Sequence, residues 1–159
     1  MLDEILISSE KSNFYKLFIA KDEKPKPIRL ILDSVNVPFG IEEYREKYVV
    51  NFEVNDSENC KMYKDTIKKI EKNIGNLIED EKVDTKTVLY ERDGMPLLCR
   101  GYIKKNRNKI ITVYKEDDKE VSLFEIQKNQ NYKIEVEISG IWRYNKTAGI
   151  YLNIISLKK

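Results

Sequence analysis

The stretch NYKIEVEISGIWRYNKTAGIYLNIISLKK, residues 131–159, decides the fold more than any other part of the sequence. Apolar and polar side chains alternate over residues 132–138, which is the period of a strand with one buried face. Gly140 then predicts a bulge, and the polar turn at 145–149 sends the chain back as a last strand. The stretch therefore predicts a terminal β-hairpin packed on a core.

Trp142, the only tryptophan, follows this glycine, and its environment depends on the bulge. If the alternation continues through Gly140, Trp142 shares the inward face with Ile138 and belongs to the core or its rim. If Gly140 is a bulge, the alternation reverses and Trp142 faces outward beside Arg143. The sequence leaves both placements open.

The remaining sequence predicts short strands around one helix. A helix is expected over residues 57–79, because one apolar stripe recurs there at helical spacing and Ser57 or Asp56 can cap it. Strands are expected at 28–35, 47–54, 96–105 and 109–115, with a short strand or a helical turn at 121–126.

This order of elements predicts a mainly β protein, an OB-fold-like small β-barrel with one amphipathic helix. A β-sandwich with a docked helix is the alternative. The polar, proline-containing segment 21–27 divides an N-terminal arm and linker, residues 1–27, from an OB-fold-like domain, residues 28–159. The connection 36–48 and the turn 143–149 are expected to be the loops that flank the binding face of such a barrel.

The composition argues against catalysis. The 159 residues include no histidine, and Cys60 and Cys99 match no zinc or redox spacing, so we expect reduced thiols in an intracellular compartment. Phosphate-binding loops and nucleophile elbows are missing from the sequence, and the carboxylates at 115–120 are expected to form a solvated turn. We therefore expect no enzymatic activity, no cofactor, no metal and no membrane span.

A basic strand face that contains a tyrosine is the clearest functional signal. Arg100, Tyr102 and Lys104 alternate with the inward Cys99 and Ile103. Cations can neutralise phosphates, and the ring can stack on an unpaired base. Because 29 basic residues nearly balance 27 acidic ones, binding to a polyanion requires segregated charge. The candidate nucleic-acid-binding residues are Arg45, Lys47, Arg100, Tyr102, Lys104, Lys105, Arg107, Lys109, Trp142, Arg143, Tyr144 and Lys146.

The sequence EVEISGIWRYNKTAGIYLNIISLKK, residues 135–159, resembles the end of the replication single-stranded-DNA-binding proteins of large nucleocytoplasmic DNA viruses and podovirus-type phages. In that family a strand runs through Gly-hydrophobic-Trp, a short basic turn with glycine follows, and a last strand completes an OB-fold. The Pro-Phe-Gly loop at 38–40 and the helix after the second strand are also similar. The resemblance implies non-sequence-specific binding of single-stranded DNA in replication or recombination.

The resemblance places DNA contacts on the strand at 100–104 and on the terminal turn at 142–146. It implies replication proteins as partners and, for a viral protein, the host cytoplasm or nucleus at replication sites. The phage members carry an acidic C-terminal tail, and Leu157-Lys158-Lys159 departs from that pattern. RNA as a ligand and a homodimer as the assembly stay open. The alternative function is a non-enzymatic β-barrel that binds another protein. A third alternative is an enzyme that uses carboxylates and a supplied metal.

Overall fold

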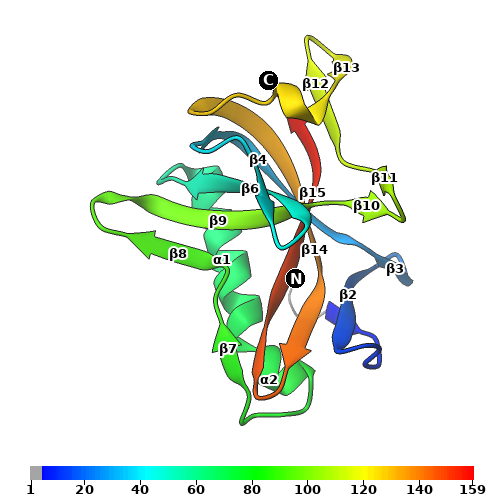
Figure 1. Ribbon diagram of the computed structural model, residues 1–159. Helices are drawn as coiled ribbons and strands as arrows, with labels where there is room; N and C mark the ends of the chain where they lie inside the picture. Colours follow the sequence, from blue (N-terminus) through cyan, green and yellow to red (C-terminus); the bar gives the residue numbers. More distant parts are fainter. Residues whose placement is uncertain (1–4) are drawn as a thin grey trace.

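The computed structural model describes residues 5–159 and shows a mainly β molecule with one substantial helix (Figure 1). Both features agree with the fold class expected from the sequence. The elements in chain order are β1 (Ile5–Ile7), β2 (Phe14–Lys21), β3 (Lys24–Lys26), β4 (Ile28–Val37), β5 (Ile41–Tyr44), β6 (Lys47–Val54), α1 (Glu58–Lys72), α2 (Ile74–Leu77), β7 (Asp84–Lys86), β8 (Leu89–Arg92), β9 (Met95–Ile103), β10 (Lys105–Asn106), β11 (Lys109–Ile110), β12 (Val113–Glu116), β13 (Lys119–Val121), a 3₁₀ turn (Leu123–Glu125), β14 (Gln130–Tyr144) and β15 (Thr147–Lys158).

Five of these strands form a partly open barrel. Strand β4 is antiparallel to β14, and β14 is antiparallel to β15. Strand β15 is parallel to β9, which is antiparallel to β6. Where β4 and β6 converge, Asn36 Nδ2 donates to Glu53 Oε1 at 2.9 Å. This arrangement is the OB-fold, as the sequence predicted, and not the β-sandwich.

Helix α1 closes one end of the barrel with its apolar stripe. It begins where Ser57 Oγ accepts a hydrogen bond from Cys60 N at 3.2 Å, and Tyr63, Ile67 and Ile70 are buried. The cap and the stripe confirm the sequence prediction. The predicted end at residue 79 is wrong, because α1 stops at Lys72 and only the short α2 follows.

The two cysteines are free and buried in this core. Cys99 Sγ lies 3.3 Å from Tyr63 Oη, and burial raises the pKa of the Cys99 thiol to about 12. A thiol with so high a pKa stays protonated and unreactive at neutral pH. Cys99 therefore behaves as a small core residue.

Two segments that the sequence presents as connections are β-hairpins. The expected loop at 36–48 contains the hairpin of β5 and β6, whose two-residue turn is Arg45-Glu46. Segment 21–27 contains the turn of the β2–β3 hairpin at Asp22-Glu23. All four turn residues have positive φ, the geometry of a type I′ turn, but none is a glycine or an asparagine. The usual sequence signal for such turns is therefore missing.

The N-terminal residues contribute to the main sheet. Strand β2 is antiparallel to β14, with Tyr15 opposite Ile141, and Leu17 is buried in the common core. The division into an arm, residues 1–27, and a domain, residues 28–159, stays a prediction.

The strand expected at 109–115 is interrupted. It divides into β11 and β12 because the backbone N–H groups of Ile111 and Thr112 both point to the Lys104 carbonyl, at 2.8 and 3.4 Å. The segment 121–126 ends β13 and then forms a 3₁₀ turn, which is the helical alternative expected there.

Gly140 is a bulge, as predicted, and it reverses the two faces of β14. The register with β15 shifts between Ile138 and Gly140, so that Ile138 and Ile141 are both buried while Trp142 turns outward. Strand β2 crosses so closely that a Cβ on Gly140 would lie 2.2 Å from the Tyr15 carbonyl oxygen. Only glycine fits this crossing without a shift of the backbone.

We therefore expect Gly140→Ala to separate β2 from β14 locally and to lower the free energy of unfolding by about 1–3 kcal/mol. Urea denaturation followed by circular dichroism measures this change. Lys133→Ala, at an exposed position on the same strand, is the control and should change stability by less than about 0.5 kcal/mol. Equal stability of the Gly140→Ala variant and the parent would show that the crossing is not tight.

Candidate nucleic-acid interface

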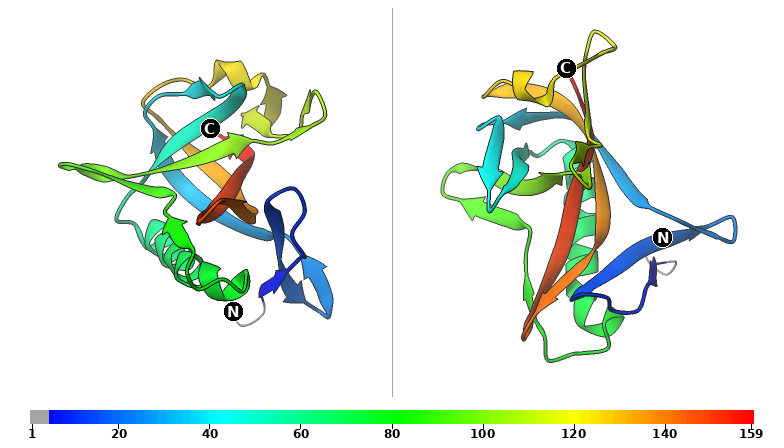
Figure 2. Two further views of the ribbon diagram at one scale, coloured as in Figure 1. Left: turned by 60° about the horizontal axis from the view of Figure 1, so that its bottom comes forward. Right: turned by 45° about the vertical axis from the view of Figure 1, so that its right-hand side comes forward.

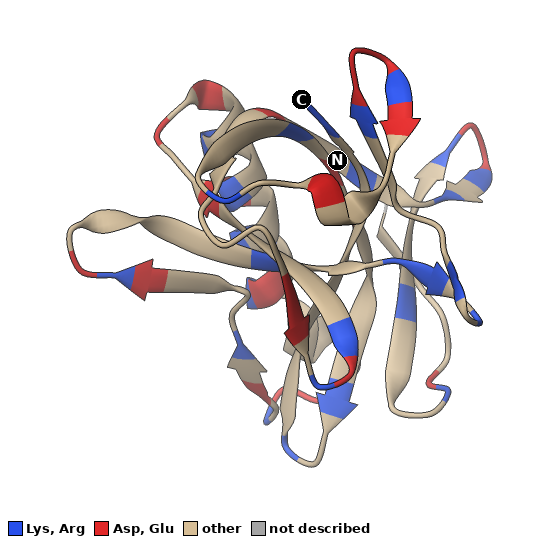
Figure 3. Ribbon diagram, turned by 45° about the horizontal axis from the view of Figure 1, so that its top comes forward, with Lys and Arg blue, Asp and Glu red and all other residues tan. Residues whose placement is uncertain are grey.

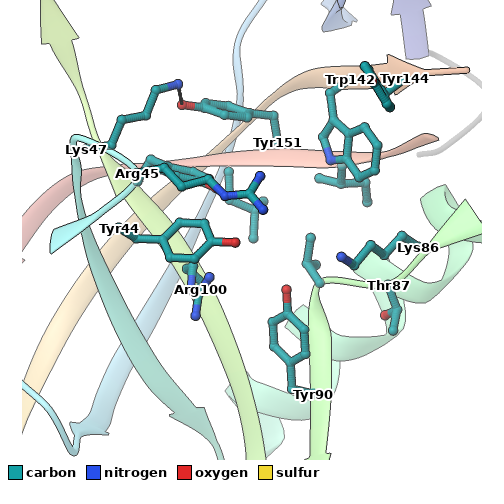
Figure 4. Close-up of a pocket in the computed structure, with 14 residues that line it drawn as sticks. Tyr44, Arg45, Lys47, Lys86, Thr87, Tyr90, Arg100, Trp142, Tyr144 and Tyr151 are labelled. Atoms are coloured by element: carbon teal, nitrogen blue, oxygen red, sulfur yellow. Dashed lines mark hydrogen bonds between the residues drawn. The ribbon is translucent and has the colours of Figure 1, made fainter. Parts of the chain in front are cut away.

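A groove of about 490 Å³ crosses the barrel face formed by β6, β9 and β15 and continues between the β5–β6 turn, the β7–β8 segment and the tip of the β14–β15 hairpin (Figure 4). In the part of the chain that the structure describes, its lining contains four cationic side chains and six aromatic rings but no carboxylate, although acids and bases nearly balance in the whole sequence. The lining residues are Tyr44, Arg45, Lys47, Lys86, Thr87, Val88, Tyr90, Arg100, Tyr102, Trp142, Tyr144, Ile150, Tyr151 and Leu152.

A stacked pair of tyrosines lies in this groove. Tyr102 of β9 and Tyr151 of β15 have ring centroids 4.7 Å apart and planes only 2° from parallel. The parallel pairing of β9 with β15, which sets Tyr102 opposite Asn153, brings the two rings together. Lys47 Nζ lies 5.4 and 5.3 Å from the two ring centroids and donates to Tyr151 Oη at 3.3 Å. The pair is a rigid aromatic surface beside a cation.

The guanidinium of Arg100 is fixed from several sides. It lies 4.4 Å from the ring centroid of Tyr44 and 6.0 Å from that of Tyr90. Arg100 Nε donates to Asn51 Oδ1 at 3.4 Å, and Asn51 Nδ2 donates to Glu42 Oε1 at 2.7 Å. Because Asn51 is only 2% exposed, this amide holds the Arg100 side chain from within the barrel wall. Arg100 thus presents its charge to the groove with little freedom to move.

The wall of the groove opposite the β5–β6 turn depends on a buried carboxylate. Glu71 of α1 accepts hydrogen bonds from Thr87 Oγ1 and from the Val88 backbone N, both at 2.8 Å. Burial raises the pKa of Glu71 and outweighs these hydrogen bonds, which act to lower it. The contact ties segment 84–92 to the helix, and this segment carries Lys86 and Tyr90 on the groove side (Figure 4).

Trp142 lies at the far end of the groove, partly buried. Its cross-strand partner is Gly149, and a Cβ at that position would lie 2.8 Å from Trp142 Cζ2 and 2.9 Å from the Lys86 carbonyl oxygen. The indole thus packs over the glycine backbone. Tyr144, which is 71% exposed, extends the aromatic surface toward the hairpin tip. Of the two placements that the sequence left open, the structure has the outward one.

A smaller hollow of about 370 Å³ continues the groove past Lys47 and Tyr151, which line both. Lys104 and Lys105 lie there with Phe14 and Tyr48. Lys105 Nζ is 4.9 Å from the Tyr48 ring centroid, so the pairing of a cation with an aromatic ring repeats in this hollow. Among the described residues, Glu46 is the one carboxylate in its lining.

The structure brings together many of the residues predicted from sequence. Lys104 and Lys105 line the smaller hollow, whereas Arg107 and Lys109 lie at the β10–β11 hairpin, outside both linings. Arg143 forms an ion pair with Asp80, and Lys146 lies in the exposed tip of the terminal hairpin. The predicted residues that line the main groove are Arg45, Lys47, Arg100, Tyr102, Trp142 and Tyr144.

Arg143 has little freedom to bind a phosphate. The hydrogen bond from its guanidinium lowers the pKa of the Asp80 carboxyl, and the same contact raises the pKa of Arg143. Both side chains are partly covered, with 25% and 32% of their surface exposed. The pair ties the terminal hairpin to the loop after α2, so a structural role accounts for this arginine.

Sequence reasoning missed Lys86, Tyr90 and Tyr151. Tyr151 could have been found, because it alternates with the buried Ile150 and Leu152 and must therefore face outward. Segment 84–92 gives a weaker signal, since only the short run Thr87–Tyr90 favours a strand. The hydrogen bonds of Glu71 to Thr87 and Val88 place this segment beside the groove. These contacts join residues that are 16 and 17 positions apart in the sequence.

Charge outside the groove is mixed. Figure 3 shows basic and acidic segments side by side on the outer hairpins. Within residues 5–159, no group of three or more Asp, Glu, Cys or His side chains could hold a metal ion. In the same range, no helix is long and apolar enough to cross a membrane.

Comparisons with known proteins show the fold. No protein-family model and no curated protein sequence matches this chain. The single-stranded DNA-binding protein of bacteriophage Enc34 in complex with ssDNA superposes with a TM-score of 0.59, at 11% identity, over 99% of this chain and 95% of that chain. A C-terminal truncation of that protein gives 0.56 at 11% identity, over 100% and 96%. Bacteriophage T7 gp2.5, a single-stranded DNA-binding protein, gives 0.52 at 13% identity, over 83% and 85%.

At these identities the likeness establishes a common architecture. The chain has the OB-fold of the phage single-stranded-DNA-binding proteins, and the resemblance read from residues 135–159 is confirmed at the level of the fold. The match covers nearly the full chain, whereas the sequence resemblance rested mainly on residues 135–159.

A buried glutamate beside the smaller hollow gives a testable pH dependence. Glu137 is 7% exposed, and its carboxylate accepts from Lys104 Nζ at 3.2 Å, Arg29 Nε at 3.2 Å and Ser139 Oγ at 3.1 Å. Burial alone would raise the pKa of Glu137, but these partners together lower it below its usual value. A carboxyl whose pKa is lower in the folded state stabilises the fold above its unfolded pKa, and this stabilisation is lost as the pH falls.

Glu137→Gln should therefore cost about 1–3 kcal/mol of unfolding free energy at pH 7 and much less near pH 3. Urea denaturation between pH about 7 and about 3 measures the difference. Glu135→Gln, two residues away on the same strand, is the control and should follow the parent at every pH. A cost for Glu137→Gln that did not change with pH would contradict the ion-pair role.

Proposed function

We propose that this protein binds single-stranded DNA with little sequence preference and acts by binding, not by catalysis. The observation that carries the proposal is the segregation of charge into one groove, where four cations and six aromatic rings meet with no carboxylate from residues 5–159. Cations that follow a phosphate backbone and rings that stack on unpaired bases are the two requirements for such binding. The groove also occupies the face and the loops that OB-folds use for oligonucleotides.

In this proposal the stacked pair of Tyr102 and Tyr151 receives a base on its open face. Arg100, held by Asn51, and Lys47 neutralise the adjacent phosphates. Bases in a duplex are hydrogen-bonded to their partners and stacked on their neighbours, so they cannot stack on the tyrosine rings. The site therefore prefers single-stranded DNA. Every base has a π-face, and stacking therefore carries little sequence information.

The strand is proposed to run from the Trp142 end of the groove toward the smaller hollow with Lys105 and Tyr48. The two spaces share Lys47 and Tyr151, which makes one continuous path. The likeness to phage proteins named as single-stranded-DNA-binding proteins, one of them in complex with ssDNA, supports the assignment. A role in DNA replication or recombination, other replication proteins as partners and an intracellular site of action belong to the same proposal.

A titration with oligo-dT tests the central claim. Because Trp142 lines the groove and is the only tryptophan, we expect its fluorescence to be quenched as oligo-dT binds, with an affinity at least about tenfold above that for a duplex of equal length. Equal or tighter binding of the duplex would contradict the stacking model. Oligo-rU of the same length, in the same titration, measures the preference between DNA and RNA.

Paired substitutions test which residues form the path. Arg100→Ala should weaken oligo-dT binding and flatten the slope of log affinity against log salt by about 0.7, the value for one lost phosphate contact on a single strand. Arg107→Ala removes the same charge outside both linings and should leave the slope nearly unchanged. If Arg107→Ala has the larger effect, the DNA follows the β10–β11 hairpin and the groove assignment is wrong.

Tyr102→Leu tests stacking separately from charge. Leucine keeps an apolar contact with Tyr151 but lacks a π-face, so binding should weaken by about 1–3 kcal/mol without a change in the salt slope. Thermal unfolding of the variant provides the control for its fold. A variant that binds as tightly as the parent would remove the Tyr102–Tyr151 pair from the binding site.

A further inference from the structure

A second, larger groove lies on another part of the molecule. Its volume is about 1020 Å³, and helix α1, the β2–β3 hairpin and the first half of β4 line it. In the left view of Figure 2, helix α1 and the N-terminal strands both lie in the lower part of the molecule. None of its lining residues belongs to the groove assigned to DNA, so it has no part in the proposed DNA path.

The floor of this second groove is apolar and partly open to solvent. Met62 on α1 is 69% exposed, and Ile31 on β4 is 46% exposed. Ile19 and Leu30 are only partly buried against the core. A contiguous apolar surface of this kind marks an interaction site, and an exposed methionine adapts to varied partners.

The rim of the groove is basic. Among residues 5–159, three cations line it, Lys21, Lys26 and Arg29, against one carboxylate, Asp22. Arg29 forms an ion pair with Glu137. Within residues 5–159, neither Lys21 nor Lys26 forms an ion pair. An occupant with acidic side chains around an apolar face would neutralise these lysines and cover the floor.

We propose that this groove is a docking site for an acidic amphipathic helix of a partner protein. A helix can lay an apolar stripe against Met62 and Ile31 while its acidic flanks meet Lys21 and Lys26, which is a recurring mode of peptide recognition. A second copy of this chain does not fit, because α1 buries its apolar stripe in its own core and exposes lysines. The site is independent of DNA binding.

The probe for the test is a fluorescein-labelled acidic peptide of about four helical turns, with leucines at i, i+3, i+4 and i+7 and glutamates elsewhere. Fluorescence anisotropy with the full chain should show saturable binding. Met62→Asp should weaken binding at least about tenfold, and Lys21→Glu combined with Lys26→Glu should do the same. The controls are Met95→Asp, which changes a methionine that is 54% exposed elsewhere, and Lys119→Glu. Both should bind the peptide like the parent.

The affinity of each variant for oligo-dT, measured in the same buffer, separates the two sites. Met62→Asp should bind oligo-dT like the parent, which also shows that it is folded. The proposal fails if the peptide does not bind, if a scrambled peptide without the apolar stripe binds equally well, or if oligo-dT displaces the peptide. A dimer in light scattering that Met62→Asp dissociates would assign the groove to a second copy and also overturn the proposal.

Discussion

The bulge at Gly140 is the constraint on which the rest of the structure depends. On its N-terminal side β14 pairs with β4, up to Ile138 opposite Ile28, and from Gly140 onward it pairs with β2. One extra residue thus lets one strand complete the barrel and then carry the N-terminal hairpin. The same residue reverses the faces of the strand, so that Ile141 continues the core and Trp142 reaches the groove. The barrel core and the groove lining therefore meet at this bulge.

The groove is held by polar groups that lie behind it. Asn51 is buried and links Glu42 to Arg100, and Glu71 is buried and ties segment 84–92 to helix α1. Buried polar groups are costly unless they are paired, and these are paired with residues that position the groove lining. The groove lining therefore has little freedom to rearrange. Pre-organised side chains lower the entropy lost on binding.

The hairpins show where sequence reasoning failed and why. Arg45-Glu46 and Asp22-Glu23 form two-residue turns with positive φ, although side chains with a Cβ adopt this region at some cost. Pairing of the flanking strands compensates for that cost, and such pairing does not show in local composition. For this reason, segment 36–48 was expected to be a plain connection, although it contains the β5–β6 hairpin. Even so, its residues Arg45 and Lys47 reached the groove as expected, since the turn still lies at the barrel rim.

The sequence by itself determined the mainly β class, the amphipathic helix, the terminal hairpin and the face of β9, because burial alternates at fixed periods that local composition records. It also indicated about half of the groove lining. Only the tertiary structure decided that Trp142 faces outward, that Arg143 is paired with Asp80, and that Tyr151 stacks on Tyr102. These outcomes depend on one register shift and on contacts between residues 49 and 63 positions apart, and the energy of such contacts does not appear in any local pattern.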